Sequence, residues 1–402
     1  MKDPNENRPG YRETKVGCIP EEWPVKYVRD FGNVVTGNTP NKGDQRNYGN
    51  HTPWCTAVDM TDKYVRKTAV CLSEAGRKQA RILPRGSVLV TCIASIGKNG
   101  IAAIDLATNQ QINTLMPAPS ASGEYFYYAI CASKKRMLRH AGQTAVPILN
   151  KSEFEALPLP FPPLHEQKKI AEILSTWDEA IEQTRKLIDA KKRRKKGLMQ
   201  QLLTGKRRLP GFSGKWKTHK LDTLFKERCE TGREDLPLLA ITGSRGVIPA
   251  EEIERKDSSS TDKSRYKRIA GGDIGYNTMR MWQGVNALSS LEGIVSPAYT
   301  ICIPSDQLCG RFLSYYFKFQ PVVHWFYRYS QGLVSDTWNL KFHHFAQISL
   351  AFPEKDEQEA IASVLRAADD EITWHEAELN ALEKQKRGLM QKLLTGTVRV
   401  VF

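Results

Sequence analysis

Two long segments of the chain place apolar residues at alternating intervals of four and three positions. In residues 164–205 the apolar residues of this pattern are Ile170, Leu174, Trp177, Ile181, Ile188, Leu198 and Leu202. In residues 354–402 they are Ile361, Leu365, Ile372, Leu379, Leu382, Leu389 and Leu393. This spacing is the seam of a left-handed coiled coil, so each segment is predicted to form a helix of about 38 residues, or roughly 57 Å.

The two helical segments are copies of one another. At an offset of 191 residues, 17 of the 40 aligned pairs between residues 166–205 and 357–396 are identical. The similarity continues upstream more faintly. The chain is therefore predicted to be an internal repeat with pseudo-twofold symmetry, in which each half is a divergent globular head followed by a well-preserved helix.

The limits of both helices are marked by residues that favour helix ends. Pro162 and Pro163 precede the first helix, and Asp356 and Glu359 have the spacing of an acidic capping box for the second. A Thr-Gly pair closes each copy.

Neither long helix is expected to remain exposed, and the favoured partner of each is the other. The second head lies between them and returns the chain at the far end, so the pair is predicted to be antiparallel. This pairing places Lys386 opposite Trp177, which gives a seam lysine an aromatic face. Lys195 then lies opposite Ala368. The alternative is that each helix packs on its own head.

The predicted fold class is α+β, with two mixed α/β heads separated by two long helices that form an antiparallel coiled coil. The predicted domains are residues 1–163 for the first head, with a flexible segment at 1–16, 164–205 for the first helix, 206–353 for the second head, and 354–402 for the second helix and C-terminal tail. Within the heads, strands are predicted at 87–92 and 299–303, and helices at 124–139 and 311–326. Such a rod with two related heads would hold two different binding surfaces a fixed distance apart.

The charge of the chain favours a polyanionic partner. The 59 Lys and Arg residues exceed the 44 Asp and Glu residues by 15. Nucleic acid is the commonest polyanion, although an anionic membrane would also satisfy this charge. No apolar run approaches the 18 residues of a membrane span, and the polar start of the chain lacks a signal peptide's apolar stretch, so we expect a cytoplasmic protein. The 8 scattered cysteines are predicted to be reduced and mostly buried, without a zinc site.

Polar and glycine-rich loops in the heads are the candidates for DNA binding. Glycine lets the backbone approach a ligand, lysine suits a phosphate, and glutamine can form paired hydrogen bonds to a base edge. In the first head the candidates are Thr36, Gly37, Thr39, Ser95, Gly97, Lys98, Gln110 and Gln111. In the second head they are Ser244, Arg245, Arg280, Trp282, Gln283, Ser296 and Tyr299. The alternatives are solvated turns and, for Arg280 and Trp282, a stacked structural pair.

Two basic clusters accompany the helices. The run Lys191–Lys196 covers every face of a helix, so a solvated or partner-contacting surface is favoured over a DNA clamp. The cluster Lys206–Arg208, where the first helix meets the second head, is a candidate rail for phosphates. Sequence motifs for nucleotide hydrolysis, acyl transfer, zinc hydrolysis, base deamination and adenine methylation are absent. Any chemistry is therefore expected to belong to a partner.

The order of these features resembles that of a known family. A head is followed by Pro-Pro-Leu-His-Glu-Gln-Lys-Lys-Ile-Ala-Glu-Ile-Leu at residues 162–174 and by Gly-Leu-Met-Gln-Gln-Leu-Leu-Thr-Gly at residues 197–205, and the order then repeats. This arrangement, over nearly the whole chain, resembles the specificity subunit of Type I restriction-modification systems. The second copy departs from the pattern at residues 353–356, where Pro-Glu-Lys-Asp replaces Pro-Pro-Leu.

The resemblance implies a DNA-specificity subunit that is not itself an enzyme. The heads would be target-recognition domains, each of which reads one half of a split double-stranded DNA site. The helices would set the gap and bind two modification subunits. Those partners would bring S-adenosylmethionine-dependent methylation, and restriction subunits would bring ATP and Mg²⁺, while this chain binds no cofactor. The other readings are a two-headed coiled-coil scaffold for acidic proteins and a nuclease with an irregular site.

Overall fold

The computed structural model describes residues 5, 8–141, 146–253, 262–334 and 337–401. The chain divides into two compact units, Met1–Arg185 with Glu378–Phe402, and Lys186–Ala377. Two helices pass from one unit to the other, namely α4 (Leu164–Leu202, 39 residues) and α9 (Lys355–Leu394, 40 residues). Within the described part of the chain, no helix has the length and apolar character needed to span a membrane.

The first unit contains two five-stranded sheets, with strand orders β4-β13-β10-β11-β7 and β5-β8-β6-β12-β9. Its strands are β1 (Tyr11–Arg12), β2 (Ile19–Pro20), β3 (Val25–Tyr27), β4 (Gly32–Thr36), β5 (Tyr48–Gly49), β6 (Thr52–Cys55), β7 (Tyr64–Val65), β8 (Val70–Leu72), β9 (Ile82–Leu83), β10 (Val88–Thr91), β11 (Asn99–Ala102), β12 (Leu106–Thr108), β13 (Ile112–Pro117) and β14 (Pro158–Pro160). Its shorter helices are α1 (Glu74–Gln79), α2 (Gly123–His140) and α3 (Lys151–Glu155). The strand predicted at 87–92 and the helix predicted at 124–139 are thus confirmed as β10 and α2.

The second unit is built on a four-stranded sheet, β16-β23-β20-β21. Its strands are β15 (Lys217–Lys220), β16 (Phe225–Glu227), β17 (Leu239–Thr242), β18 (Gly246–Pro249), β19 (Lys267–Ile269), β20 (Ile274–Asn277), β21 (Asn286–Leu288), β22 (Gly293–Val295), β23 (Tyr299–Pro304) and β24 (Ser349–Phe352). Its shorter helices are α5 (Leu221–Leu224), α6 (Gly310–Tyr316), α7 (Gln320–Tyr329) and α8 (Phe342–Phe345). The predicted strand at 299–303 is confirmed as β23, and both heads mix helices and strands as expected.

The helical structure predicted near 311–326 is present as two helices, α6 and α7, with a break between them. Phe319 is extended, with φ −76° and ψ 124°, and Pro321 lies in the first turn of α7. A proline ring tolerates the first turn of a helix but would clash with the carbonyl four residues earlier if α6 continued through it. The proline therefore starts a new helix rather than extending the old one.

The predicted limits of the long helices are correct except at the start of α9. Pro163 directly precedes α4, and Gly205 and Gly396 adopt the left-handed φ of +66° and +70° that ends a helix. The acidic capping box is wrong, because α9 begins at Lys355 and Asp356 already lies inside the first turn. There its carboxylate faces the positive end of the helix dipole.

The predicted seam residues are all buried or half-buried. The fully buried ones are Ile170, Leu174, Ile181, Ile188, Leu202, Ile361, Leu365, Ile372 and Leu393. The half-buried ones are Trp177, Leu198, Leu379, Leu382 and Leu389. In the first unit Leu174 and Leu393 share a core with Phe126 of the head. In the second unit Leu202 and Leu365 share a core with head residues. Each helix end therefore packs against both the other helix and a head.

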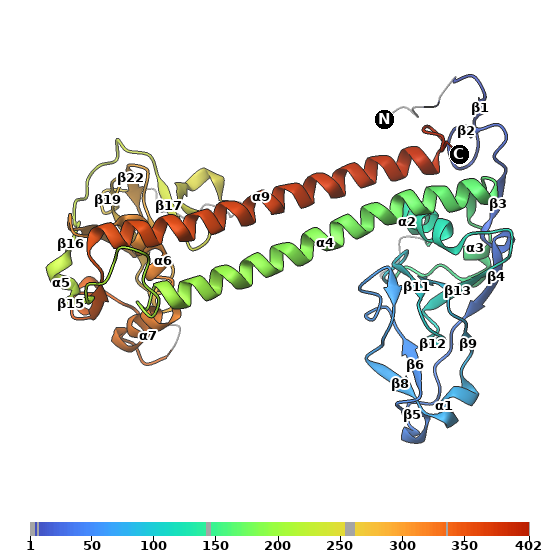
Figure 1. The fold of residues 1–402 in the computed structure, drawn as a ribbon, viewed down its shortest axis with the longest axis horizontal. Helices are drawn as coiled ribbons and strands as arrows, with labels where there is room; N and C mark the ends of the chain where they lie inside the picture. The colour runs from blue at the N-terminus through green and yellow to red at the C-terminus, as the bar shows by residue number, and fades with distance from the viewer. Residues whose placement is uncertain (1–4, 6–7, 142–145, 254–261, 335–336, 402) are drawn as a thin grey trace. The chain divides into compact units, whose positions relative to one another are not determined.

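Within each unit α4 and α9 run in opposite directions (Figure 1), and ion pairs join the two helices. They are Asp178–Lys386 and Arg185–Glu383 in the first unit, and Lys191–Glu371, Lys192–Glu376 and Lys195–Asp369 in the second. From Asp178 to Arg185 in the first unit, and from Lys192 to Lys195 in the second, the partner on α9 shifts toward the start of that helix. The lysine run thus contacts the partner helix in the second unit.

The predicted partners of the two seam lysines are wrong by one residue. Lys386 pairs with Asp178 rather than lying on Trp177, and Lys195 pairs with Asp369 rather than facing Ala368. A lysine side chain is long enough to reach past its facing residue to the nearest carboxylate. The aromatic faces next to both lysines come from the heads instead.

In each unit, an arginine that follows the end of one long helix pairs with a glutamate near the start of the other long helix. Arg399 pairs with Glu166 at 2.9 Å, and the matching Arg208 pairs with Glu357 at 2.6 Å. Because Arg208 is held in this way, the proposed phosphate rail retains only Lys206 and Arg207 as exposed cations.

The predicted flexible segment at 1–16 lies partly outside the described residues, since 1–4 and 6–7 are not described. In its described part, Arg8 donates to the Thr397 carbonyl at 2.9 Å and Tyr11 donates to that of Gly396 at 2.5 Å. β1 also pairs with β2. This part of the N-terminal segment is therefore hydrogen-bonded to the C-terminal tail.

All cysteines are free thiols, and most are shielded from solvent. Cys18, Cys55, Cys92 and Cys302 are buried, whereas Cys229 is exposed. Burial raises the pKa of Cys55 and of Cys92 to about 12, so both remain protonated at neutral pH. The cysteines are thus free thiols as predicted, but only half of them are buried.

Candidate nucleic-acid interface

The three candidate loops of the first head meet at one end of the sheet β4-β13-β10-β11-β7. Thr36 at the end of β4 pairs with Asn113, and Thr91 at the end of β10 pairs with Ile112 at the start of β13. Loops 36–40, 92–98 and 109–111 therefore leave the sheet together. Hydrogen bonds join them, from Gly37 N–H to the Ile112 carbonyl at 3.0 Å and from Cys92 N–H to that of Gln111 at 2.8 Å.

Ser95 and Gln110 are the most exposed candidates in these loops, while Thr39 and Gln111 are half-buried. The Thr39 hydroxyl donates to the side-chain oxygen of Gln110, which orients that carboxamide at the surface. The Gln111 carboxamide accepts a hydrogen bond from Asn109 at 3.2 Å. These side chains form a polar rim with acceptors and donors of the kind that read base edges.

Three other candidates in the first head hold the loops together. A side chain at Gly37 would come within 2.3 Å of the Asn109 carbonyl, and one at Gly97 would come within 3.1 Å of Lys134. Both glycines thus allow the chain to pack closely on itself. Lys98 donates from its amine to the Ala57 carbonyl at 2.6 Å, which anchors the second loop.

The candidate loops of the second head also meet at one end of its central sheet. Asn277 at the end of β20 pairs with Tyr299 at the start of β23, and β21 begins at the same end. The Thr278 hydroxyl donates to the Ala298 carbonyl at 2.6 Å and so ties loop 278–285 to loop 296–299. The turn between β17 and β18 lies next to them, with Gly243 facing Val285.

The candidate residues in these second-head loops differ in their exposure and in whether their charge is already paired. Ser244, Arg245, Arg280 and Gln283 are exposed, while Trp282, Ser296 and Tyr299 are half-buried. Arg245 is paired with Glu252 at 2.5 Å. Within the described parts of the chain, the Arg280 guanidinium has no hydrogen-bond or ion-pair partner, which leaves its charge available to an external phosphate or base.

An aromatic cluster borders the same loops. Trp282 packs edge-on against Trp338 with ring centres 5.1 Å apart, and Trp338 packs against Tyr327 at 4.9 Å. Tyr327 lies on α7, which also carries the exposed Trp325. The Arg328 guanidinium lies over the Trp325 ring. Trp282 is therefore part of an aromatic group, and no stacking of Arg280 on it is seen among the described residues.

A hollow of about 510 Å³ lies between the two loops of the second head. Its wall includes Thr278, Met279 and Pro297 from the loops. Lys267, Lys341 and His343 add cationic or ionisable groups, and Glu227 adds a carboxylate. Lys267 is already paired with Glu227 at 3.4 Å. A concave surface that carries Lys341 and His343 beside exposed polar loops is suited to a segment of nucleic-acid backbone.

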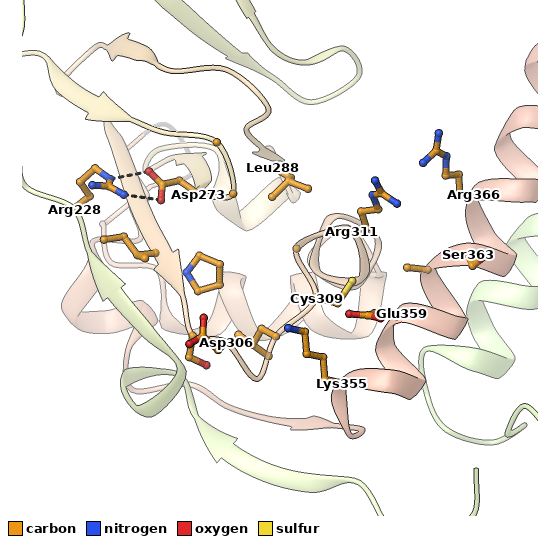
Figure 2. A pocket seen from close by; sticks show the side chains of 18 of the residues that line it. Arg228, Asp273, Leu288, Asp306, Cys309, Arg311, Lys355, Glu359, Ser363 and Arg366 are labelled. Atoms are coloured by element: carbon orange, nitrogen blue, oxygen red, sulfur yellow. Dashed lines mark hydrogen bonds and ion pairs between the residues drawn. The ribbon is translucent and has the colours of Figure 1, made fainter. Parts of the chain in front are cut away.

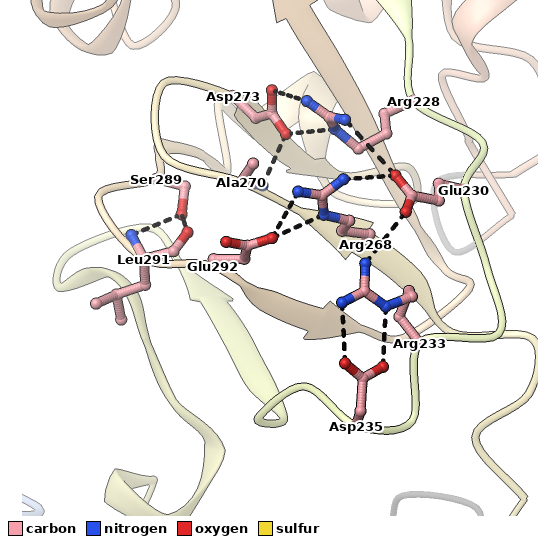
Figure 3. Close-up of polar contacts among 10 residues, drawn as sticks. All are labelled: Arg228, Glu230, Arg233, Asp235, Arg268, Ala270, Asp273, Ser289, Leu291 and Glu292. Carbon is pink, nitrogen blue, oxygen red and sulfur yellow. Dashed lines mark hydrogen bonds and ion pairs between the residues drawn. The ribbon is translucent and has the colours of Figure 1, made fainter.

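A network of arginines and carboxylates occupies a different edge of the second head (Figure 3). Arg268 bridges Glu230 at 2.8 Å and Glu292 at 2.6 Å. Arg228 makes two hydrogen bonds to Asp273, and Arg233 makes two to Asp235. The guanidinium of Arg268 lowers the pKa of Glu230 by hydrogen bonding. Because their charges are already matched, these arginines hold strands together rather than forming an anion-binding surface.

A second hollow, of about 1050 Å³, lies between this edge, α6 and the start of α9. Figure 2 shows Arg311 on α6 and a row of α9 side chains that includes Lys355, Glu359 and Arg366. Its charges are of both signs, and none of the predicted DNA-binding residues lines it. It is therefore separate from the loop surface.

Comparison with known proteins agrees with this architecture. Residues 20–190 match the family described as the Type I restriction modification DNA specificity domain. The Type I restriction enzyme MjaVIII specificity subunit of Methanocaldococcus jannaschii is 25% identical, over 95% of this chain and 94% of that protein. Over nearly its whole length the chain is therefore similar to a Type I restriction enzyme specificity subunit.

Other similarities of the chain are more local or more distant. The MjaIX specificity subunit of M. jannaschii is 33% identical over 185 residues, which cover 44% of this chain and 42% of that protein. The Type I restriction-modification S subunit from M. genitalium has a similar fold, with a TM-score of 0.56 and 14% identity over 93% of this chain and 96% of that one.

Several residues at the loop surfaces of the two heads could not be predicted from the sequence. Arg81 is exposed and donates to the Thr36 carbonyl at 2.6 Å, so it adds a cation beside the first candidate loop. Trp338 and Tyr327 join Trp282 from distant parts of the sequence. No local motif marks any of the three, because only the folded chain brings them to these loops.

Proposed function

We propose that this chain is the noncatalytic DNA-specificity subunit of a Type I restriction-modification complex. Each head would read one half of a bipartite double-stranded DNA target, and α4 and α9 would form one antiparallel coiled coil that sets the gap between the halves. The observation that carries the proposal is that the candidate loops of both heads meet at one end of a central sheet, in a chain whose helices are paired within each unit.

The predicted DNA-binding residues fall into two roles under this proposal. The exposed side chains of Ser95, Gln110, Arg280 and Gln283 would contact bases or phosphates. Gly37, Gly97 and Lys98 would shape the loops that present them. The net charge of +15 would attract the phosphates of DNA, which are present whatever the base sequence.

Partners would supply the chemistry. Two modification subunits would dock on the helices and bring S-adenosylmethionine, and restriction subunits would bring ATP and Mg²⁺. Binding to acidic proteins by a two-headed scaffold is the less favoured reading, because a scaffold gives no reason for exposed base-reading groups at matching ends of both sheets. The expected location is the cytoplasm, where the host DNA lies.

Exchange of the first head tests whether each head reads its own half of the target independently of the other. Replacing residues 17–160 with the corresponding part of another specificity subunit should change one half of the methylated target and leave the other half and the gap unchanged. The measurement is methylation mapping of host DNA after coexpression with the modification subunits. Exchange of residues 211–352 is the matched control and should change only the other half. If either exchange altered both halves, the heads would not read the target independently.

A further inference from the structure

The two long helices hold their heads through the same contacts in both units. In the first unit, Gln167 of α4 accepts a hydrogen bond from the N–H of Ser122, the residue that caps α2, at 2.9 Å. In the second unit, Gln358 of α9 accepts one from the N–H of Cys309, the residue that caps α6, also at 2.9 Å. Each long helix thus fixes the start of one head helix.

A second contact lies further along the same head helix. In the first unit the Tyr128 hydroxyl donates to Asp178 of α4, and Lys386 of α9 pairs with the same carboxylate. The Lys386 amine lies 5.4 Å from the centre of the Tyr128 ring. A head, α4 and α9 therefore meet at a single carboxylate.

The second unit contains the same cluster with the helices exchanged. The Tyr315 hydroxyl donates to Asp369 of α9 at 2.8 Å, and Lys195 of α4 pairs with Asp369 at 2.5 Å. The Lys195 amine lies 5.3 Å from the Tyr315 ring centre. Each tyrosine is the sixth residue after the cap of its helix.

The repeat retains these residues although the heads have diverged. Asp178 matches Asp369 and Lys195 matches Lys386 at the offset of 191, so both pairs belong to the 17 identical ones. Core packing does not require the two aspartates and two lysines to be retained, because their side chains are only partly buried, with exposed fractions of 20–39%. Partly exposed polar groups kept in both copies point to a role in geometry rather than in bulk stability.

We propose that the clusters Tyr128–Asp178–Lys386 and Tyr315–Asp369–Lys195 are positioning devices that fix the orientation of each head on the helix pair. They would thereby restrict the complex to a single gap between the half-sites. The apolar cores beneath the heads resist separation but allow small rotations, whereas a charge-assisted hydrogen bond to a defined carboxylate oxygen is directional. This inference rests on the proposed function, since a gap has meaning only for a bipartite target.

In the first unit, Lys63 makes additional contacts that brace Tyr128 against α4. Lys63 donates to Tyr128 at 3.0 Å and to Ser175 of α4 at 2.8 Å, and it also pairs with Glu124. This brace keeps Tyr128 in place when Asp178 is altered. Replacing Asp178 should therefore release the head from α9 without unfolding it.

The test combines methylation mapping with a distance measurement on the full chain in complex with the modification subunits. In the Asp178→Asn variant, the bases of both half-sites should be unchanged, while methylated sites with a second gap length should appear beside the original one. Glu179→Gln is the matched control, since Glu179 is the adjacent exposed residue of α4, and it should keep the single gap. Lys386→Arg should also keep it, whereas Lys386→Met should not.

Spin labels within the first unit make the test independent of methylation. With exposed Cys229 replaced by serine, labels at Val58 and at exposed Lys384 report the distance between the head and α9. Asp178→Asn, or Tyr128→Phe if the first variant does not fold, should broaden that distance distribution. An unchanged distribution together with one unchanged gap overturns the inference. If the unaltered complex methylates no bipartite site, the proposed function itself fails, which is a different outcome.

Discussion

Inserting one heptad into each long helix should lengthen the gap between the two half-sites by about three base pairs without changing the bases read. Matched insertions after Arg185 in α4 and after Ala377 in α9 keep the seam in phase, since seven residues are one seam repeat. Seven residues add about 10.5 Å of helix, and DNA rises about 3.4 Å per base pair. Methylation mapping of host DNA measures the gap.

The control for this insertion changes only one helix. Seven residues added to α4 alone would shift its seam against α9 and break the order of the ion pairs, so methylation should be lost rather than moved to a new gap. If the matched insertions left the gap unchanged while altering the bases, the helices would not be the spacer.

Replacing Gln358 by alanine should lower the free energy of unfolding of the second unit by about 3 kcal/mol. Its side chain is 1% exposed. The carboxamide donates to the Pro353 carbonyl at 2.9 Å and the Gln307 carbonyl at 3.1 Å, and it accepts from Cys309 N–H at 2.9 Å. Truncation would leave these main-chain groups without a partner in a site closed to water.

Gln200 provides the matched control for this substitution, because it is an exposed glutamine on a long helix in the same unit. Gln200→Ala should change the free energy of unfolding by less than about 0.5 kcal/mol. Chemical denaturation, with hydrogen exchange of the α6 amides to locate the effect, measures both variants. Equal losses for the two substitutions would show that the Gln358 contacts contribute nothing specific.

The helices were predictable from the sequence because their signal is local and repeated. The heptad spacing places Leu174 and Leu365 on the buried face wherever the helix packs, and Gly205 ends its helix through its own backbone freedom. The partner of Lys386 was not predictable in the same way. Antiparallel alignment identifies the facing residue, but a flexible side chain selects the nearest carboxylate, here Asp178.

The heads were predictable only in part, because their contacts join distant segments. Strands such as β10 follow from runs of β-branched and apolar residues, whereas the break before Pro321 required weighing a proline against a helical pattern. The gathering of loops 36–40 and 109–111 depends on the register of β4 with β13, which no local pattern specifies. Arg81 and Trp338 were missed for the same reason.

A signal for the head contacts was nevertheless present in the repeat. Gln167 and Gln358 are an identical polar pair that lies next to the first seam residues, and both are buried. Buried polar groups that persist in both copies indicate a defined hydrogen bond. Tyr128 and Tyr315 gave no such signal, because they match at an offset of 187 rather than 191.

The central claim is that one chain reads two separate half-sites at a distance set by its own helices. Mapping every methylated adenine in host DNA, after coexpression of this chain with its modification subunits, tests it most directly. The expected result is one motif with two specified halves and a single constant gap of unspecified bases. A contiguous motif without a gap, or two halves found at many different gaps, would contradict it.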